Sequence, residues 1–80
     1  MTDKEKHTND VQFQIECLSH DLIEMLMERY GLTMEQAINK LYTSHTYQKI
    51  ENELTGMYYQ SSEYNFCFLE EEFGLHPSFH

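Results

Sequence analysis

The sequence predicts a small all-α fold, a four-helix bundle with one long N-terminal helix and three shorter helices. Apolar residues recur with helical spacing through most of the 80 residues. Glycines and helix-capping residues separate these periodic stretches. A chain of this length buries only about 60–65% of its unfolded surface. We therefore expect one domain with a thin core over residues 10–75, between a disordered tail of residues 1–9 and a C-terminal tail of residues 76–80.

The first helix is predicted over residues 10–30, with Asn9 or Asp10 as its N-cap and Gly31 ending it. One row consists of Val11, Ile15, Leu18, Leu22, Met25, Leu26 and either Arg29 or Tyr30. A second row beside it consists of Phe13, Cys17, His20, either Ile23 or Glu24, and Met27. A stripe this wide indicates a central helix or one that buries a second face in a partner. A homodimer through this helix is one such arrangement.

The second helix is predicted over residues 33–43 and has the clearest start. Thr33 suits the N-cap, and Gln36 at the third helical position can complete a capping box. Its inner face is expected to contain Met34, Ala37, Ile38, Leu41 and Tyr42.

The third helix is predicted over residues 45–54, starting at Ser44 or Thr46 and stopped by Gly56. Helical spacing predicts an inner row of Tyr47, Ile50 and Leu54.

The segment that follows is unusually rich in aromatic residues for a connection. Met57, Tyr58 and Tyr59 must pack against something, and because Tyr58 and Tyr59 are adjacent, only one of them is expected to face inward. Ser61 or Ser62 can then cap a last helix over residues 62–73. The alternating aromatic residues there would also suit a strand, but no partner strand is evident, so the sequence favours a helix.

Charge is unevenly distributed along the chain. The net charge is −9, and the last lysine or arginine is Lys49. Six glutamates follow it: Glu51, Glu53, Glu63, Glu70, Glu71 and Glu72. This half should repel a nucleic-acid backbone and attract a basic protein. The last three glutamates also oppose the dipole of the predicted helix, and a cationic partner is one candidate for compensating them.

No catalytic, cofactor or metal signature is evident. Cys17 and His20 are three residues apart on a helix, but two ligands do not make a structural zinc site, and His76 and His80 lie in an irregular stretch with Pro77 between them.

Both cysteines lie in apolar rows and are expected to be free and buried, in a reducing cytoplasm. No apolar leader or membrane-length segment is present. We therefore expect a non-enzymatic cytoplasmic protein without a cofactor.

A DNA-binding alternative comes from the second and third helices, which could form a helix-turn-helix acting as a dimer. The recognition helix would be residues 47–53, with one lysine and two glutamates. That composition argues against docking in a groove of DNA.

The favoured hypothesis is a protein-interaction module with a basic protein partner. Tyrosine is frequent at interface hot spots because it buries a large area and keeps a polar tip. The predicted partner surface combines the tyrosines of the aromatic segment with neighbouring glutamates: Tyr58, Tyr59, Tyr64, Glu63, Glu70 and Glu71.

The overall pattern resembles a group of short, uncharacterised bacterial proteins. The likeness covers residues 11–73 and rests on Gly31-Leu32-Thr33, Leu41-Tyr42, Thr55–Ser61, Tyr64 and Leu69–Glu72. Some relatives of that type are encoded beside ADP-ribosyltransferase-like toxins. The resemblance implies a helical accessory or antitoxin-like protein, or a regulatory partner of a neighbouring gene product. It supplies no functional residues.

Overall fold

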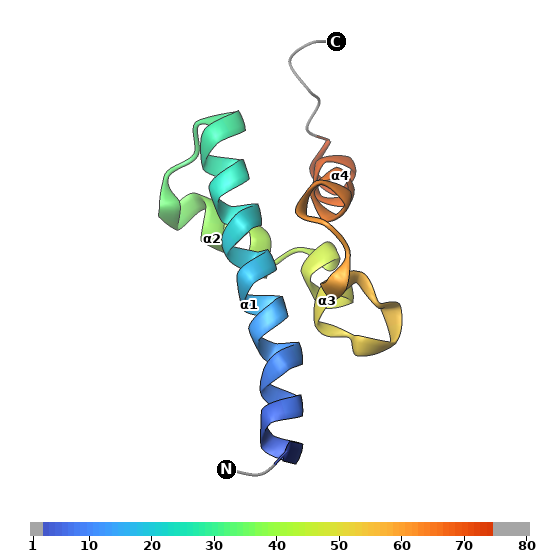
Figure 1. The fold of residues 1–80 in the computed structure, drawn as a ribbon. Helices are drawn as coiled ribbons and strands as arrows, with labels where there is room; N and C mark the ends of the chain where they lie inside the picture. Colours follow the sequence, from blue (N-terminus) through green and yellow to red (C-terminus); the bar gives the residue numbers. More distant parts are fainter. Residues whose placement is uncertain (1–2, 75–80) are drawn as a thin grey trace.

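The fold is all-α, as the sequence predicts (Figure 1). A computed structural model describes residues 3–74 of the chain, with side chains from Asp10 onward. The elements are α1 (Asp3–Tyr30), α2 (Met34–Tyr42), α3 (His45–Glu51), the short 3-10 helices η1 (Glu53–Thr55) and η2 (Met57–Tyr59), and α4 (Ser62–Phe73). Within residues 3–74 there are four α-helices and no strand. The predicted tail of residues 76–80 lies outside this range.

Helix α1 begins at Asp3, well before the predicted start near residue 10 (Figure 1). The predicted N-cap at Asn9 or Asp10 is therefore wrong. No glycine or proline interrupts residues 3–10, and lysine and glutamate are good helix formers. Asp3 and Glu5 also lie at the end of the helix dipole that favours negative charge. The polar composition that suggested a tail is thus compatible with a solvated helical turn.

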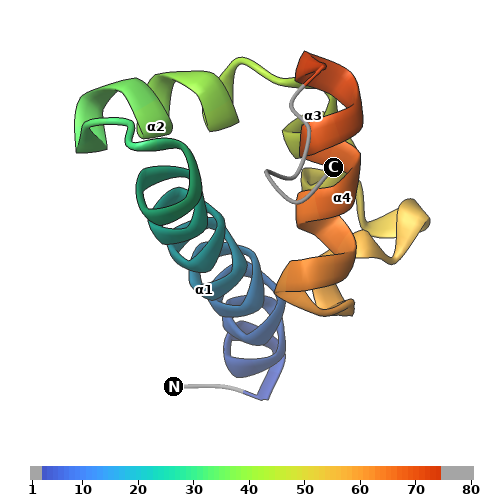
Figure 2. The same ribbon diagram turned by 90° about the horizontal axis from the view of Figure 1, so that it is seen from above.

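The core is built on the first predicted row of α1, from which Ile15, Leu18, Leu22 and Leu26 are buried. Helix α1 contacts α2, α4 and η2, so it is the central element. The other elements contribute the remaining buried apolar residues: Ala37, Leu41, Ile50, Met57, Phe66 and Leu69. In Figure 2, α2 lies across the C-terminal end of α1, and α4 lies to the right of α1. None of the helices in residues 3–74 is long and apolar enough to span a membrane.

The predicted start of α2 is confirmed. The Thr33 hydroxyl accepts a hydrogen bond from the Gln36 backbone at 3.1 Å, and the Gln36 side chain accepts one from the Thr33 backbone at 3.0 Å. This reciprocal pair is a capping box. Because both partners are within four residues, the sequence alone was enough to predict it.

The predicted end of the third helix is wrong. Helix α3 stops at Glu51, where Asn52 adopts an extended backbone and its side chain accepts a hydrogen bond from the Leu54 backbone at 3.0 Å. Asparagine often competes with helical hydrogen bonding in this way. The change of direction leaves Leu54 95% exposed, although its spacing had predicted an inward position.

The aromatic connection is packed down, as predicted. Met57 is buried and Tyr58 packs partly against the core, whereas Tyr59 is 65% exposed. The two rings meet edge to face with centroids 5.2 Å apart. The expectation that one tyrosine faces inward and the other is exposed is confirmed. Gly56 makes the turn with φ +68°, a conformation that side chains other than glycine's rarely adopt.

Replacing Gly56 by alanine should cost more stability than replacing Gly31, which has almost the same φ of +67°. Each change should cost about 1 kcal/mol from the left-handed backbone. Only at Gly56 would the new Cβ lie 3.0 Å from the Tyr59 hydroxyl, adding about 0.5 kcal/mol of side-chain strain. Urea unfolding of both variants measures the difference. If the excess persists when Tyr59 is also replaced by alanine, the contact is not its cause.

Helix α4 is confirmed as a helix, capped by the Ser61 side chain on the Tyr64 backbone at 3.1 Å. Three side-chain pairs tie it to α1: Arg29 to Glu63 at 2.9 Å, Asp21 to Ser62 at 2.8 Å, and Tyr30 to Glu70. In the Tyr30–Glu70 pair, burial of the Tyr30 side chain has the largest effect on its pKa, and the neighbouring Glu70 carboxylate adds to it. Together they raise the pKa of Tyr30 to about 12. The Tyr30 hydroxyl thus remains a donor to Glu70 at neutral pH.

Glu72 joins the C-terminal end of α4 to the N-terminal end of α3. Its carboxylate accepts hydrogen bonds from the backbone N–H of His45 at 2.7 Å and of Thr46 at 2.9 Å, and from the Thr46 hydroxyl at 2.8 Å. The Ser44 hydroxyl accepts from Tyr47 N–H at 2.9 Å. The first-turn donors of α3 are therefore all satisfied, two of them by a residue from another helix.

Candidate protein-binding groove

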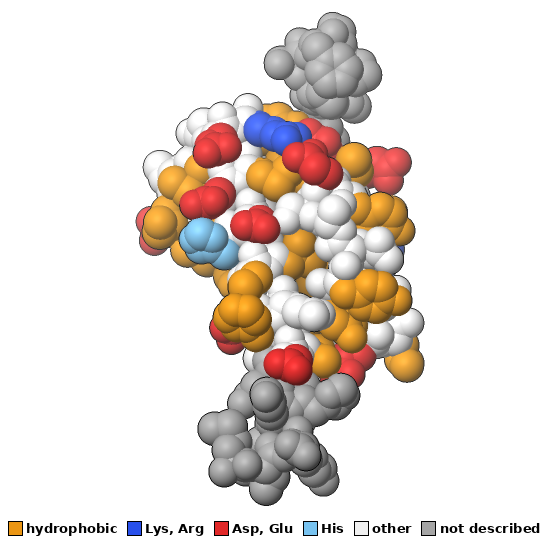
Figure 3. Space-filling view, in the orientation of Figure 1, with side chains coloured by type: hydrophobic (Ala, Val, Ile, Leu, Met, Phe, Trp, Pro, Cys, Tyr) orange, Lys and Arg blue, Asp and Glu red, His pale blue; other side chains and the backbone are white. Residues whose placement is uncertain are grey.

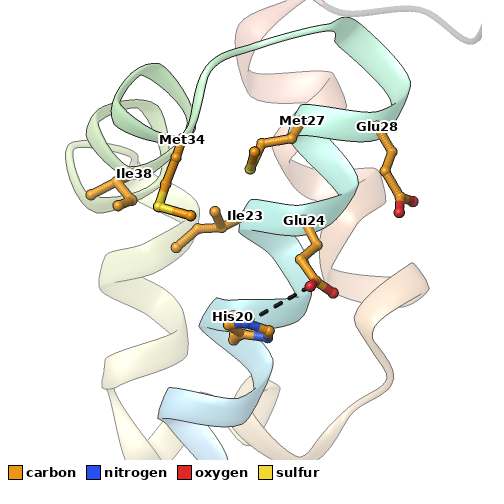
Figure 4. Close-up of a pocket in the computed structure, with 7 residues that line it drawn as sticks. All are labelled: His20, Ile23, Glu24, Met27, Glu28, Met34 and Ile38. Carbon is orange, nitrogen blue, oxygen red and sulfur yellow. Dashed lines mark ion pairs between the residues drawn. The ribbon is translucent and has the colours of Figure 1, made fainter.

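One hollow in the described surface is an open groove between α1 and α2, with a volume of about 310 Å³ (Figure 4). Four apolar side chains form its floor, Ile23 and Met27 from α1 and Met34 and Ile38 from α2. We call this site the α1–α2 groove. Met34 is 60% exposed and Ile38 is 38% exposed, so the floor is open to a partner.

The groove arises because α2 carries more apolar residues than one face can bury. Ala37 and Leu41 pack into the core. Met34, Ile38 and Tyr42 follow one another at intervals of four and lie exposed on an outer ridge. The prediction that all five form the inner face is therefore wrong for these three.

Carboxylates border the groove. Glu24 and Glu28 lie along its α1 side and extend away from the apolar floor (Figure 4). Glu35 lines a separate hollow on α2, which shares Ile38 with the groove. His20 completes the rim, with its Nε2 atom 3.8 Å from a Glu24 oxygen. Neither lysine nor arginine lines this part of the described surface. Carboxylate groups also spread over the upper part of the face seen in Figure 3.

The six residues of the predicted partner surface do not form one patch. Tyr58 and Tyr59 lie beside α1, where they share a shallow cleft with Phe13 and Cys17. Cys17 is exposed there, and Cys67 on α4 is exposed too. The expectation that both thiols are buried is therefore wrong, because each lies at the edge of its apolar row where no other element covers it.

The other four predicted residues lie on two sides of α4. Tyr64 is on the outer side, with its ring 5.2 Å from that of Phe68, and Glu71 borders a shallow hollow beside Phe68. Glu63 and Glu70 face α1 and are hydrogen-bonded to it, to Arg29 and Tyr30 respectively. These two carboxylates hold α4 against α1, so they are less available to a partner than a carboxylate without a hydrogen bond.

One group of side chains has the proximity expected of metal ligands. His20, Asp21 and Glu24 on α1 bring one ligand atom each within 4.8 Å of the others. All three are exposed, and exposed acidic groups are common without a metal. Cys17, the ligand that the sequence pairs with His20, is not part of this group. The other histidines considered, His76 and His80, lie outside the described residues.

Comparisons with protein-family models, with curated proteins and with solved structures found no match to the chain. The resemblance to short bacterial proteins encoded beside toxins therefore stays a prediction.

Sequence reasoning did not identify the α1–α2 groove, although two signals pointed to it. The second row of α1 includes Ile23 and Met27, whereas the buried core residues of α1 all come from the first row. The second helix has five apolar positions, whereas two suffice for its buried face. Surplus apolar residues on two consecutive helices predict a shared exposed surface.

Proposed function

We propose that the protein is a non-enzymatic interaction module and that a basic segment of a partner protein binds in the α1–α2 groove. One observation carries this proposal: an exposed apolar floor bordered on its α1 side by two carboxylates, Glu24 and Glu28. Contiguous apolar surface of this kind is typical of protein-binding sites. Methionine suits such a site because its flexible side chain adapts to a partner.

Charge supports a basic partner over an acidic or neutral one. The net charge of −9 attracts a cationic protein over a distance of about 8 Å at physiological salt. Two carboxylates at the rim, Glu24 and Glu28, then favour lysine or arginine beside the apolar contact.

An antitoxin-like or regulatory role fits a module of this kind, and a neighbouring gene product is the first partner to test. We place the protein in the cytoplasm, since two exposed free cysteines suit a reducing compartment.

A dimeric DNA-binding regulator is less well supported by the geometry. The N-terminal turn of α3 would have to approach DNA, as in a helix-turn-helix. Its backbone donors at His45 and Thr46 are already bonded to the Glu72 carboxylate. A negative group thus occupies the position where a phosphate would bind. Retention of the protein on duplex DNA at low salt, with a steep loss at higher salt, would favour this alternative instead.

The proposal can be tested with a photo-reactive amino acid introduced at position 34 in cells of the native host. We expect a cross-link to one protein, at a segment rich in lysine and arginine. The same amino acid at position 54 is the matched control, because Leu54 is also exposed but lies outside the groove. The change Ile38→Asp should abolish the cross-link from position 34. Equal cross-linking from both positions, or none from position 34, would refute the proposed site.

A further inference from the structure

We infer that the segment bound in the α1–α2 groove is an amphipathic α-helix of two to three turns, with apolar residues on one side and lysine or arginine beside them. This inference rests on the proposed function and specifies the form of its ligand. Three features of the groove lead to it: the secondary structure of its walls, the spacing of its exposed ridge, and the distribution of charge at its rim.

The walls favour a helical ligand over an extended one. An extended peptide binds most often by adding a strand to an open sheet edge. Residues 3–74 contain no strand, so the described surface offers no such edge. Two neighbouring helices instead provide ridges and grooves into which a third helix can pack. A helical ligand also satisfies its own backbone hydrogen bonds, which an apolar floor cannot do.

The exposed ridge on α2 sets the length of the ligand. Met34 and Ile38 line the groove, Tyr42 continues the same exposed row four residues further along α2, and α2 has 9 residues. At a rise of 1.5 Å per residue this helix is about 13 Å long. A ligand helix packed along it would make contact over two to three turns. Apolar residues at i, i+4 and i+7 of the ligand would present a matching row to the floor.

The rim sets the charge of the ligand. Glu24 and Glu28 are four residues apart on α1 and lie on the same side of the floor. A helix with its apolar row on the floor would therefore place the residues that flank that row on the α1 side near these two carboxylates. Lysine and arginine at those positions keep their charge in water while their stems extend the apolar contact.

Methionine methyl groups provide a direct readout of this binding. Met27 and Met34 line the groove, whereas Met25 and Met57 pack against the core outside it. The full-length protein would be labelled with ¹³C at the methionine methyls and titrated with a 12-residue peptide. This peptide carries leucine at i, i+4 and i+7, lysine on both flanks, and a covalent i, i+4 bridge on the opposite face that fixes the helix.

We expect saturable shifts of the Met27 and Met34 signals and unchanged Met25 and Met57 signals. Alternating D-residues keep the side-chain composition but prevent the helix, so this control peptide should bind at least tenfold more weakly. Replacing the lysines by glutamate should weaken binding by about tenfold or more, since attraction to Glu24 and Glu28 is replaced by repulsion. Ile38→Asp should remove the shifts, whereas Leu54→Asp should not.

Other outcomes would overturn the inference. Equal binding of the helical and the D-residue peptides would show that the groove does not select a helix. An absence of shifts at Met27 and Met34 would show that the groove does not accept this ligand class, while the cross-link from position 34 would still test the proposed function separately. Concentration-dependent shifts of these two signals without any peptide would show that a second copy of the chain fills the groove.

Discussion

Replacing Asn65 by aspartate is expected to lower the free energy of unfolding by about 3 kcal/mol at pH 7. Asn65 is fully buried, and its Nδ2 donates to the backbone oxygens of Met57 and Ser61, both at 3.0 Å. This amide fastens η2 to the start of α4. A carboxylate has no proton to donate, and it would place negative charge beside two carbonyl oxygens. In an 80-residue domain with a stability of about 4–12 kcal/mol, this is a large loss.

The deficit of the Asn65→Asp variant should depend on pH. Burial raises the pKa of an introduced carboxyl above its usual value of about 3.9. Below about pH 3.9 the introduced carboxyl is protonated in both the folded and the unfolded state, so the variant loses little stability. As the pH rises, the unfolded chain ionises first, so stability should fall until the folded-state pKa is reached. Urea unfolding at several pH values measures this slope.

The matched control is Asn65→Leu, which removes the donors without adding a charge. It should cost about 1–3 kcal/mol, because the Met57 and Ser61 oxygens each lose the side-chain donor and keep only a backbone donor, and the cost should not vary with pH. If the aspartate variant were as stable as the original protein at pH 7, or if its deficit were independent of pH, the proposed role of Asn65 as a donor would be wrong.

Replacing Glu72 by alanine is the second change with a large expected effect, about 2 kcal/mol of unfolding free energy. The carboxylate supplies three hydrogen bonds to the start of α3, and two backbone donors would be left to water alone. Glu71→Ala is the matched control, since it removes the same charge from the same turn and the Glu71 side chain makes no hydrogen bond in the described part of the chain. The control should change stability by less than about 0.5 kcal/mol. Equal losses in both variants would indicate a general charge effect instead of a cap.

The contribution of Glu72 should also disappear in acid. Although burial acts in the opposite direction, the hydrogen bonds from His45 and Thr46 lower the pKa of Glu72 below its usual value of 4.5. A lowered folded-state pKa gives stability that is present above the unfolded-state value and lost as the pH falls through the folded-state value. The Glu72→Gln variant should lose this acid-dependent part, so its stability should vary less below pH 4.5 than that of the original protein.

The features that sequence predicted well depend on nearby residues. The capping box of Thr33 and Gln36, the Ser61 cap and the turn at Gly56 each involve chemistry within a few positions. Helical spacing likewise identified the buried row of α1, because the period of the helix fixes which side chains share a face. The number and order of the α-helices followed from these local signals.

The features that sequence missed depend on which elements meet. Helical spacing cannot tell whether a second helix covers an apolar residue, so Cys17, Cys67 and Met34 were expected inside and are exposed. Charge along the chain had suggested that Glu72 opposes its own helix dipole and calls for an external cation. The nearest source of positive potential is instead the N-terminus of α3, which only the folded arrangement brings close.

The link between Glu72 and α3 has a consequence for the order of events during translation. The chain grows from its N-terminus, and Glu72 is made 26 residues after Thr46. Until α4 is almost complete, the first backbone donors of α3 have only solvent as a partner. A seven-residue helix is too short to be stable by itself. We therefore expect α1 and α2 to form while the chain is being synthesised, and α3 to become stable only when the ribosome has released the last turn of α4.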